Sequence, residues 1–179
     1  STDDVVITVN EGATGSAGAD ASICAGTTHT LSGSVGGSAG SSVWTSSGTG
    51  TFDDTTSATA TYTPSAADVL LGTITLTITT DDPDAGGPCT AATDDMVLTF
   101  YASPTASIAS SVDILCTGDN TGSATAAATG GTGPYTYVWS DPSFQTTIMA
   151  TGLYAGQVGV MVTDANGCQD TVSIVLTRS

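Results

Sequence analysis

Apolar and polar residues alternate in several short segments of the chain. The clearest segment is 73–79, where Ile74, Leu76 and Ile78 share one face and the intervening threonines share the other. Residues 58–63 alternate in the same way, with Tyr62 on the inner face. A period of two residues indicates a strand with one buried face. Threonine-rich segments of this kind, with few residues typical of amphipathic helices, predict an all-β chain.

The same pattern predicts strands in both halves of the chain, joined by loops rich in Gly and Ser. In the first half we expect strands at 27–33, 42–46, 58–63, 73–80 and 94–101. In the second half we expect them at 105–109, 112–116, 122–129, 135–139, 145–151, 156–163 and 171–177. Trp44 and Trp139 each fall on a central strand, where an Ig-like sandwich carries its large core aromatic residue. The chain is therefore expected to form two antiparallel β-sandwiches.

A repeated segment sets the expected domain boundaries. Residues 2–8 read TDDVVIT and residues 93–99 read TDDMVLT, separated by about the length of one small β-sandwich. We therefore expect residues 1–18 to be the last strand of a preceding repeat plus a Gly/Ala/Ser linker. Residues 19–103 are expected to form the first sandwich and residues 104–179 the second, with the boundary at Ser103-Pro104.

Charge restricts the partners of this chain. Its 179 residues carry 17 acidic side chains and one basic side chain, Arg178, which gives a net charge of −16. Such a chain repels nucleic acid and anionic membrane surfaces. It also has no apolar run near the roughly 18 residues that a membrane-spanning helix needs. All but one of the acids are Asp, which forms turns and binds hard cations more readily than it supports helices.

Four cysteines, at positions 24, 89, 116 and 168, have no zinc-site spacing. Three pairings are possible. Dividing the chain near Pro104 places two cysteines in each half, which favours Cys24–Cys89 and Cys116–Cys168, each stabilising by about 4 kcal/mol in the chain-entropy model. The alternative is four reduced, buried thiols, which an extracellular composition disfavours.

A calcium site is the sharpest metal hypothesis. Asp81, Asp82 and Asp84 follow the 73–80 strand directly, and Asp94 with Asp95 opens the next strand. Antiparallel neighbours would bring these carboxylates to one end of the sandwich, where a divalent cation would relieve their repulsion. The alternative is a solvated acidic loop, because no established calcium-loop signature is present.

Other candidate sites are weaker. His29 is the only histidine, and no nucleophile turn accompanies it, so no catalytic residue is predicted and an enzyme is not expected. Threonine rows at 59 and 61 and at 73, 75, 77 and 79 could share a face that binds ice or sugar, although an ordinary solvent face is favoured. Asp54-Thr55-Thr56 and Asp170-Thr171-Val172 resemble a bacterial O-glycosylation pattern.

The second half resembles the SprB repeat of Bacteroidetes surface adhesins. The matching segments are Cys116-Thr117-Gly118, GSATAAATGGTGPYTYVWSD at 122–141, TGLYAG at 151–156 and VTDANGCQDTVSI at 162–174. In that family one Cys opens the module and the VTDANGC segment closes on the second. Gly159 departs from the family pattern, and an extra glycine in a strand suggests a bulge.

The first half resembles the PKD- or Ig-like repeats that accompany such modules, through GADASICAG at 18–26, HTLSG at 29–33 and TYTPSAADVLLGTITLTIT at 61–79. Together the resemblances imply a segment of an SprB-type gliding-motility adhesin. They imply a very large protein on the outer cell surface, exported by type IX secretion, with neighbouring repeats, an external surface or polysaccharide, and the gliding machinery as partners. The alternative is a carbohydrate-binding module of a secreted polysaccharide-degrading enzyme, which would present exposed Trp or Tyr residues.

Overall fold

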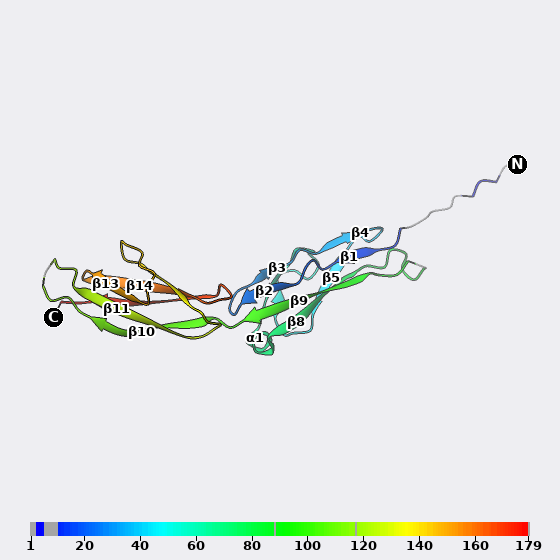
Figure 1. Cartoon of the computed structure of the whole chain (residues 1–179). Coiled ribbons are helices and arrows are strands. Elements are labelled where there is room, and N and C mark those ends of the chain that lie inside the picture. Colours follow the sequence, from blue (N-terminus) through cyan, green and yellow to red (C-terminus); the bar gives the residue numbers. More distant parts are fainter. Residues whose placement is uncertain (1–2, 6–10, 88, 117, 179) are drawn as a thin grey trace. The chain divides into compact units, whose positions relative to one another are not determined.

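A computed structural model describes residues 3–5, 11–87, 89–116 and 118–178 (Figure 1). The chain divides into two compact units, Ser1–Phe100 and Tyr101–Ser179. The predicted boundary at Ser103-Pro104 lies a few residues after this division. Most of the strand expected at the start of residues 1–18 lies outside the described residues, and residues 3–5 have no regular secondary structure.

Unit 1 is a β-sandwich built from short strands. One sheet has the order β2-β9-β8-β5, a second has the order β3-β7-β6, and β1 pairs with β4. The strands are β1 (Thr14–Ser16), β2 (Ala21–Cys24), β3 (His29–Thr30), β4 (Ser34–Gly36), β5 (Ser42–Ser46), β6 (Thr51–Phe52), β7 (Thr61–Thr63), β8 (Thr73–Thr80) and β9 (Thr93–Tyr101). Figure 1 shows β8 and β9 side by side along the length of this unit.

The core of unit 1 follows from the alternation seen in the sequence. Ile74, Leu76 and Ile78 of β8 are buried, as expected, and they pack with Trp44 from β5 and Tyr62 from β7. The Trp44 indole nitrogen donates a hydrogen bond to the Ser57 carbonyl oxygen at 3.1 Å. A buried indole N–H needs such a partner. The prediction of Trp44 as the core aromatic residue is confirmed.

One helix, α1 (Ala66–Leu71), was not expected from the sequence. Ser65 caps its N-terminus in a capping box, in which the Ser65 and Asp68 side chains each accept the other's backbone N–H. Gly72 ends the helix in the left-handed conformation, with φ of 79°. The Ser-x-x-Asp spacing and the following glycine are recognised helix signals. They were present in the sequence and could have predicted this element.

The Gly/Ala/Ser stretch expected to be a linker contains β1 and is part of the sandwich. Ala17 is fully buried, and its N–H donates to a carboxylate oxygen of Asp94 at 2.8 Å. A Cβ placed on Gly15 would lie only 3.1 Å from the Thr80 methyl group. Small residues therefore allow this strand to lie close against β8, and the linker prediction was wrong.

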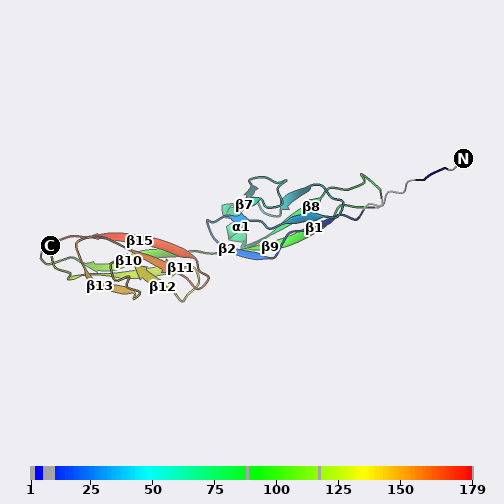
Figure 2. The same cartoon turned by 90° about the horizontal axis from the view of Figure 1, so that it is seen from above.

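Unit 2 is a second β-sandwich of two three-stranded sheets, ordered β10-β11-β13 and β12-β14-β15. Figure 2 shows β10, β11 and β13 together, with β15 running along the unit. The strands are β10 (Pro104–Val112), β11 (Gly122–Gly130), β12 (Thr136–Trp139), β13 (Met149–Leu153), β14 (Gly156–Thr163) and β15 (Gln169–Leu176). The strands expected at 105–109 and 112–116 are replaced by the single strand β10, which has a register shift between Ile108 and Ser110.

The core of unit 2 is built from small and branched side chains around one indole ring. Trp139 is fully buried, and its indole nitrogen donates to the Thr147 carbonyl oxygen at 2.9 Å. Val158, Val160 and Val162 of β14 point inward, so Gln157, Gly159, Met161 and Thr163 lie on the outer face. The prediction that Trp139 is a core residue is confirmed.

The predicted cysteine pairs Cys24–Cys89 and Cys116–Cys168 are wrong. Cys24 and Cys168 are disulfide-bonded, whereas Cys89 and Cys116 are thiols. In unit 1, the Ala17 N–H donates a hydrogen bond to the Asp94 carboxylate, and the Asp20 carboxylate accepts one from the Val97 N–H. The chain that enters β2 therefore runs parallel to β9, toward the C-terminal end of β9. Cys24 therefore lies at that end, while Cys89 precedes the start of β9.

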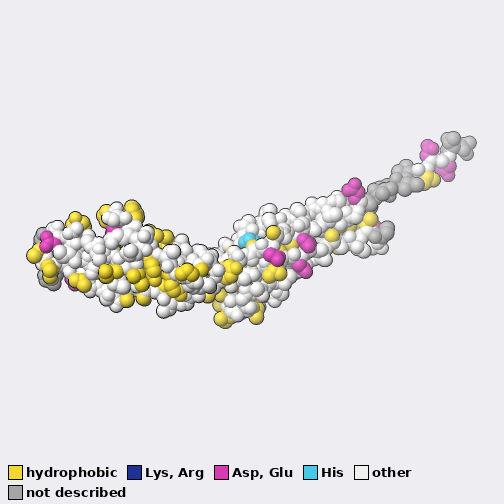
Figure 3. Space-filling view, in the orientation of Figure 1, with side chains coloured by type: hydrophobic (Ala, Val, Ile, Leu, Met, Phe, Trp, Pro, Cys, Tyr) yellow, Lys and Arg dark blue, Asp and Glu magenta, His cyan; other side chains and the backbone are white. Residues whose placement is uncertain are grey.

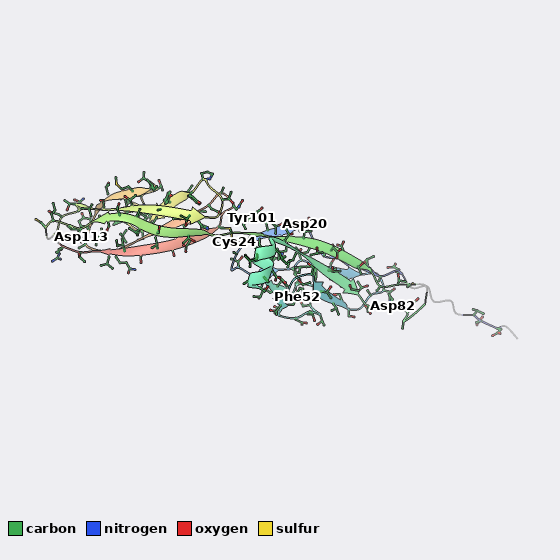
Figure 4. The ribbon with its side chains drawn as sticks, turned by 90° about the horizontal axis from the view of Figure 1, so that it is seen from below. Asp20, Cys24, Phe52, Asp82, Tyr101 and Asp113 are labelled. Atoms are coloured by element: carbon green, nitrogen blue, oxygen red, sulfur yellow. The ribbon has the colours of Figure 1, made fainter. Side chains whose placement is uncertain are left out.

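The distance along β9 explains the correction. This strand has nine residues and spans about 30 Å, whereas the Cα atoms of a disulfide lie only about 4.4–6.8 Å apart. Figure 4 shows Cys24 and Asp82, which belongs to the loop of Cys89, at opposite ends of unit 1. Unit 2 repeats the arrangement. Cys168 precedes β15, and Cys116 follows Ile114, which bridges to Arg178 beyond the other end of β15.

Candidate functional site

Four of the five aspartates expected to bind calcium accept hydrogen bonds from backbone N–H groups of unit 1, and the fifth, Asp95, is exposed. Asp81 accepts the N–H groups of Gly40 and Ser41, both at 2.9 Å, and so fixes the loop before β5. Asp84 accepts from Gly87 and Cys89 at 3.0 Å, and its own N–H donates to Asp82. Each of these carboxylates stabilises a turn, which is the ordinary role of Asp in loops.

Asp94 and Asp95 point to opposite faces of β9. Asp94 shares the inner face with Met96 and accepts the Ala17 N–H, whereas Asp95 is exposed opposite Thr77 of β8. Successive strand residues alternate in this way, so a neighbouring pair cannot bind one ion together. Within the described part of the chain, no three His, Cys, Asp or Glu side chains are grouped to hold a metal ion. The expected convergence of carboxylates is therefore not found there.

The other candidate residues of the first half also occupy ordinary structural positions. His29 lies on β3 opposite Tyr62 of β7, and partial burial lowers its pKa because it disfavours the charged imidazole. Thr73, Thr75, Thr77 and Thr79 of β8 line the outer face of the β2-β9-β8-β5 sheet. Thr61 belongs to β7, in another sheet. The two threonine rows therefore do not share a face.

Asp68 is the most deeply buried acid, with no exposed surface. Its carboxylate accepts hydrogen bonds from the N–H groups of Thr49, Gly50 and Ser65 and from the Tyr62 hydroxyl, at 2.7 to 2.9 Å. Burial would raise the pKa of Asp68, but these donors outweigh it and lower the pKa to about 2. The charged carboxylate thus connects α1, β7 and the loop before β6.

In unit 2, Asp164 of the VTDANGC segment has the same structural role. Its carboxylate accepts N–H groups of Thr132, Asn166 and Cys168, each at 2.9 Å. The Thr132 bond is the main reason that the pKa of Asp164 is lowered. This motif therefore joins the turn before β12 to the turn before β15, which explains its place in the module without any bound ligand.

The main concave feature of unit 2 is a hollow of about 380 Å³ on the outer face of the β12-β14-β15 sheet, here called the Gly159 hollow. Gly159 pairs with Ser173, and next to it Met161 lies between Val138 and Thr171. The Gly159 N–H donates to the Ser140 hydroxyl at 2.8 Å. The hollow is lined by Val138, Trp139, Ser140, Phe144, Gly159, Val160, Met161, Thr171, Val172 and Ser173.

Phe144 stands at the edge of this hollow in a strained conformation. Its φ is 47°, in the left-handed region that bulky residues rarely adopt, and 68% of its surface is exposed. Asp141 holds the loop, because its carboxylate accepts the N–H groups of Ser143 and Gln145 at 3.1 and 3.0 Å. Burial would raise the pKa of Asp141, but the bonds from Gln145 and Ser143 keep it below its usual value.

Gln145 connects this loop to the opposite sheet. Its amide accepts from and donates to the backbone of Thr151 in β13, at 3.0 and 2.9 Å, and it also donates to Asp141 at 3.1 Å. The loop backbone that carries Phe144 is therefore held by hydrogen bonds from Asp141 and from Gln145. Backbone strain held by its surroundings is typical of functional sites, so Phe144 is a candidate that the sequence did not single out.

A second, smaller hollow of about 170 Å³ has one lining residue, Ser140, in common with the first. This Tyr154 hollow is lined by Ser140, Asp141, Pro142, Gly152, Leu153, Tyr154, Ala155, Gly156, Gln157 and Val158. Tyr154 is 58% exposed. On the face shown in Figure 3, hydrophobic side chains cover much of unit 2, whereas acidic side chains lie mainly on unit 1. Each hollow is lined by one of the exposed aromatic residues Phe144 and Tyr154, and the two hollows are therefore the candidate functional site.

Both residues predicted as glycosylation acceptors, Thr55 and Thr171, are exposed, and Thr171 lines the Gly159 hollow. Among the described residues, no helix is long and apolar enough to cross a membrane.

Comparison with solved structures shows the immunoglobulin-like fold. The eight N-terminal Ig domains of Down Syndrome Cell Adhesion Molecule isoform 1.30.30 match with a TM-score of 0.53 at 11% identity, over 89% of this chain and 26% of that one. Sidekick-1 immunoglobulin domains 1–4 match at 15% identity, with a TM-score of 0.45, over 98% of this chain and 51% of that one. This chain thus spans about half or less of either structure. No curated protein sequence matches it.

A family model matches part of unit 2, from the middle of β10 to the strained phenylalanine of the β12–β13 loop. The matched segment includes β11 and the Trp139 strand, which carry the GGTGPY and VWSD motifs. The VTDANGC segment, which Asp164 ties to the GGTGPY turn, lies beyond it. The match is to the SprB repeat, over residues 108–144, so this chain carries an SprB-type repeat in its second unit.

Proposed function

We propose that this chain is a repeat segment of a very large secreted cell-surface adhesin used in gliding motility and surface attachment. The observation that carries the proposal is the SprB repeat match, which lies within the second of two Ig-like sandwiches. Chains of small β-sandwiches extend binding regions away from a surface or present weak adhesive faces themselves. The segment has no catalytic role in this proposal.

The geometry supports an adhesive role in addition to a spacer role. A pure spacer needs only folded units and has no use for a strained, exposed aromatic residue beside a hollow. Both Trp residues are buried, whereas Tyr154 is 58% exposed, so exposed aromatic residues do not separate the adhesin from a carbohydrate-binding module. The SprB repeat match is what favours the adhesin proposal over a module of a secreted polysaccharide-degrading enzyme.

The test uses the organism that encodes the chain. Antibodies raised against residues 11–178 are expected to label intact cells, and their Fab fragments are expected to slow gliding and reduce attachment to glass and agar. Fab fragments from pre-immune serum provide the control. Labelling only after the cells are broken would contradict the proposed location, and normal gliding and attachment of fully labelled cells would contradict the proposed role.

A further inference from the structure

We propose that the Gly159 hollow and the Tyr154 hollow together form one groove that binds a neutral polysaccharide chain. The inference rests on the proposed adhesin function and names the class of ligand that the segment would hold. Four features of unit 2 support it: the floor of the groove, its polar and apolar lining, its two exposed aromatic rings and its charge.

The floor depends on a glycine that the fold itself does not require. A Cβ built on Gly159 would lie 3.4 Å from the Val172 carbonyl oxygen and 3.6 Å from the Ser140 hydroxyl, which are ordinary van der Waals contacts. The backbone φ of Gly159 is also outside the left-handed region. A glycine inside a central strand lacks a side chain to pack and weakens the strand. Its effect here is to leave space on an otherwise continuous sheet face.

The lining of the Gly159 hollow combines hydroxyl groups with apolar surface. Ser140, Thr171 and Ser173 supply hydroxyls, and Val138 and Met161 supply the apolar part. A pyranose ring has a C–H face and an equatorial edge of hydroxyl groups, so it needs both kinds of contact. The volume of about 380 Å³ falls within the range of small-ligand sites.

The aromatic residues indicate a chain rather than a single group. Phe144 lines the first hollow and Tyr154 the second, and Ser140 lines both. Each ring offers an apolar face to one sugar unit, and aromatic residues are the principal apolar contacts of such sites. A single inserted apolar side chain of a protein partner would occupy only one of the two hollows. The paired hollows therefore favour consecutive sugar units.

Charge favours a neutral ligand. None of the residues that line the Gly159 hollow is ionisable. Asp141 in the Tyr154 hollow is occupied with the backbone of its own loop. The net charge of −16 repels an anionic polysaccharide. No positive charge lines either hollow to offset this repulsion.

The experiment is a titration of the full chain, followed by amide NMR, with cellohexaose, xylohexaose, laminarihexaose and agarohexaose. At least one neutral hexasaccharide is expected to bind saturably and to shift amide signals of β12, β14 and β15. Phe144→Ala and Gly159→Val are each expected to weaken binding at least tenfold. Tyr154→Ala is expected to weaken binding of the hexasaccharide more than that of the matching disaccharide. Leu70→Ala, an exposed apolar change on α1 in unit 1, provides the matched control and is expected to have no effect.

Amide spectra of each variant establish that unit 2 is folded before its affinity is compared, and Phe144→Ala tests the groove if Gly159→Val does not fold. Failure of all four neutral sugars to bind would overturn the inference, as would full affinity in folded Phe144→Ala. Preferential binding of an oligogalacturonate or of an apolar hexapeptide at β14 would also overturn it. If no sugar binds but antibodies still label intact cells and Fab fragments still inhibit gliding, only the groove inference fails and the adhesin proposal stands. The failure of each proposal is therefore distinguishable.

Discussion

Short carboxylates organise this chain at the scale of single residues. Asp68, Asp141 and Asp164 are buried, and each accepts two or more backbone N–H groups from a nearby turn or loop. The Asp side chain is short enough to reach the backbone of its own loop, which the longer Glu side chain does less well. The strong preference for Asp over Glu therefore reflects loop geometry, and the sequence-based link to calcium is not needed to explain it.

Replacing Asp68 with Asn is expected to destabilise unit 1 by about 3 kcal/mol, because buried donors lose a charged acceptor. The Asn amide also directs its own N–H groups toward the donors of Thr49, Gly50 and Ser65. The measurement is urea unfolding followed by amide NMR signals of unit 1. The matched control is Asp95→Asn on the exposed face of β9, where a change within about 0.5 kcal/mol is expected. Equal stability of the two variants would show that the Asp68 contacts contribute little.

The lowered pKa of Asp68 also predicts a pH dependence. A carboxyl group with a pKa of about 2 when folded and 3.8 when unfolded contributes stability that is fully present above about pH 5. The contribution is lost as the pH falls from about 4 to 2, and the lowered pKa values of Asp141 and Asp164 act in the same direction in unit 2. The free energy of unfolding, measured from pH 7 to pH 2, is expected to fall more steeply with pH below pH 4. In Asp68→Asn the slope for unit 1 should be smaller, and an unchanged slope would contradict the assignment.

The two thiols are expected to differ in reactivity. Burial and the charge of Asp84 raise the pKa of Cys89, so that less thiolate is present at pH 8. Cys116 is exposed. Maleimide should therefore label Cys116 faster than Cys89 in the folded chain, with the rates measured by mass spectrometry of peptides. Asp84→Asn is expected to accelerate labelling of Cys89 several-fold and to leave Cys116 unchanged. Labelling at Cys24 or Cys168 in the unreduced chain would contradict the disulfide assignment.

At the scale of elements, the sequence pattern predicted the long strands and missed several of the short ones. The Ile/Leu face of β8 and the valine face of β14 each repeat a buried residue at every second position, so their strands could be located from the sequence. The strands β1, β4 and β6 have only two or three residues, which is too few to show a period. The helix α1 was overlooked because its signal lies in its caps, Ser65 and Gly72, and not in its composition.

The candidate site could not be predicted for a different reason. Phe144 and Tyr154 lie in loops, and the position of Phe144 beside the Gly159 hollow depends on the pairing of β12 with β14 and on the loop held by Asp141. Only the unusual Gly159 was visible in the sequence, where it suggested a bulge. The structure instead pairs β14 with β15 in continuous register through Gly159. The predicted cysteine pairs were wrong for a similar reason. The sequence indicated which half of the chain contains each cysteine, but not where each cysteine lies along the strands.

The end of α1 offers a test at this scale. Gly72 has a φ of 79° and its N–H bonds to the Val69 carbonyl oxygen, so an alanine there would have to adopt a left-handed conformation. Gly72→Ala is expected to reduce the stability of unit 1 by about 1 kcal/mol. Nothing lies within 4 Å of a Cβ at this position, so crowding does not contribute. Leu71→Ala, at an exposed neighbouring position, provides the control. Unchanged stability of unit 1 in Gly72→Ala would show that the left-handed conformation of Gly72 contributes little to the helix end.

At the scale of the whole molecule, the main feature is the excess of negative charge. Seventeen acids are opposed by one arginine, so repulsion among carboxylates cannot be offset by ion pairs within the chain. Salt screens such repulsion over about 10 Å at 0.1 M ionic strength. The folded chain is therefore expected to become more stable as salt is added, in contrast to proteins that depend on surface ion pairs.

The same reasoning separates screening from a specific calcium site. Thermal unfolding is expected to shift to higher temperature between 10 and 300 mM NaCl, because the folded state holds its carboxylates closer together than the unfolded chain does. Because Asp81 and Asp84 are bound to separate turns and Asp94 and Asp95 face opposite ways, calcium should add nothing beyond this screening. Millimolar calcium, magnesium and NaCl at equal ionic strength are expected to give the same midpoint. A larger shift with calcium, abolished by chelator and by Asp84→Asn, would establish the site that the five aspartates first suggested.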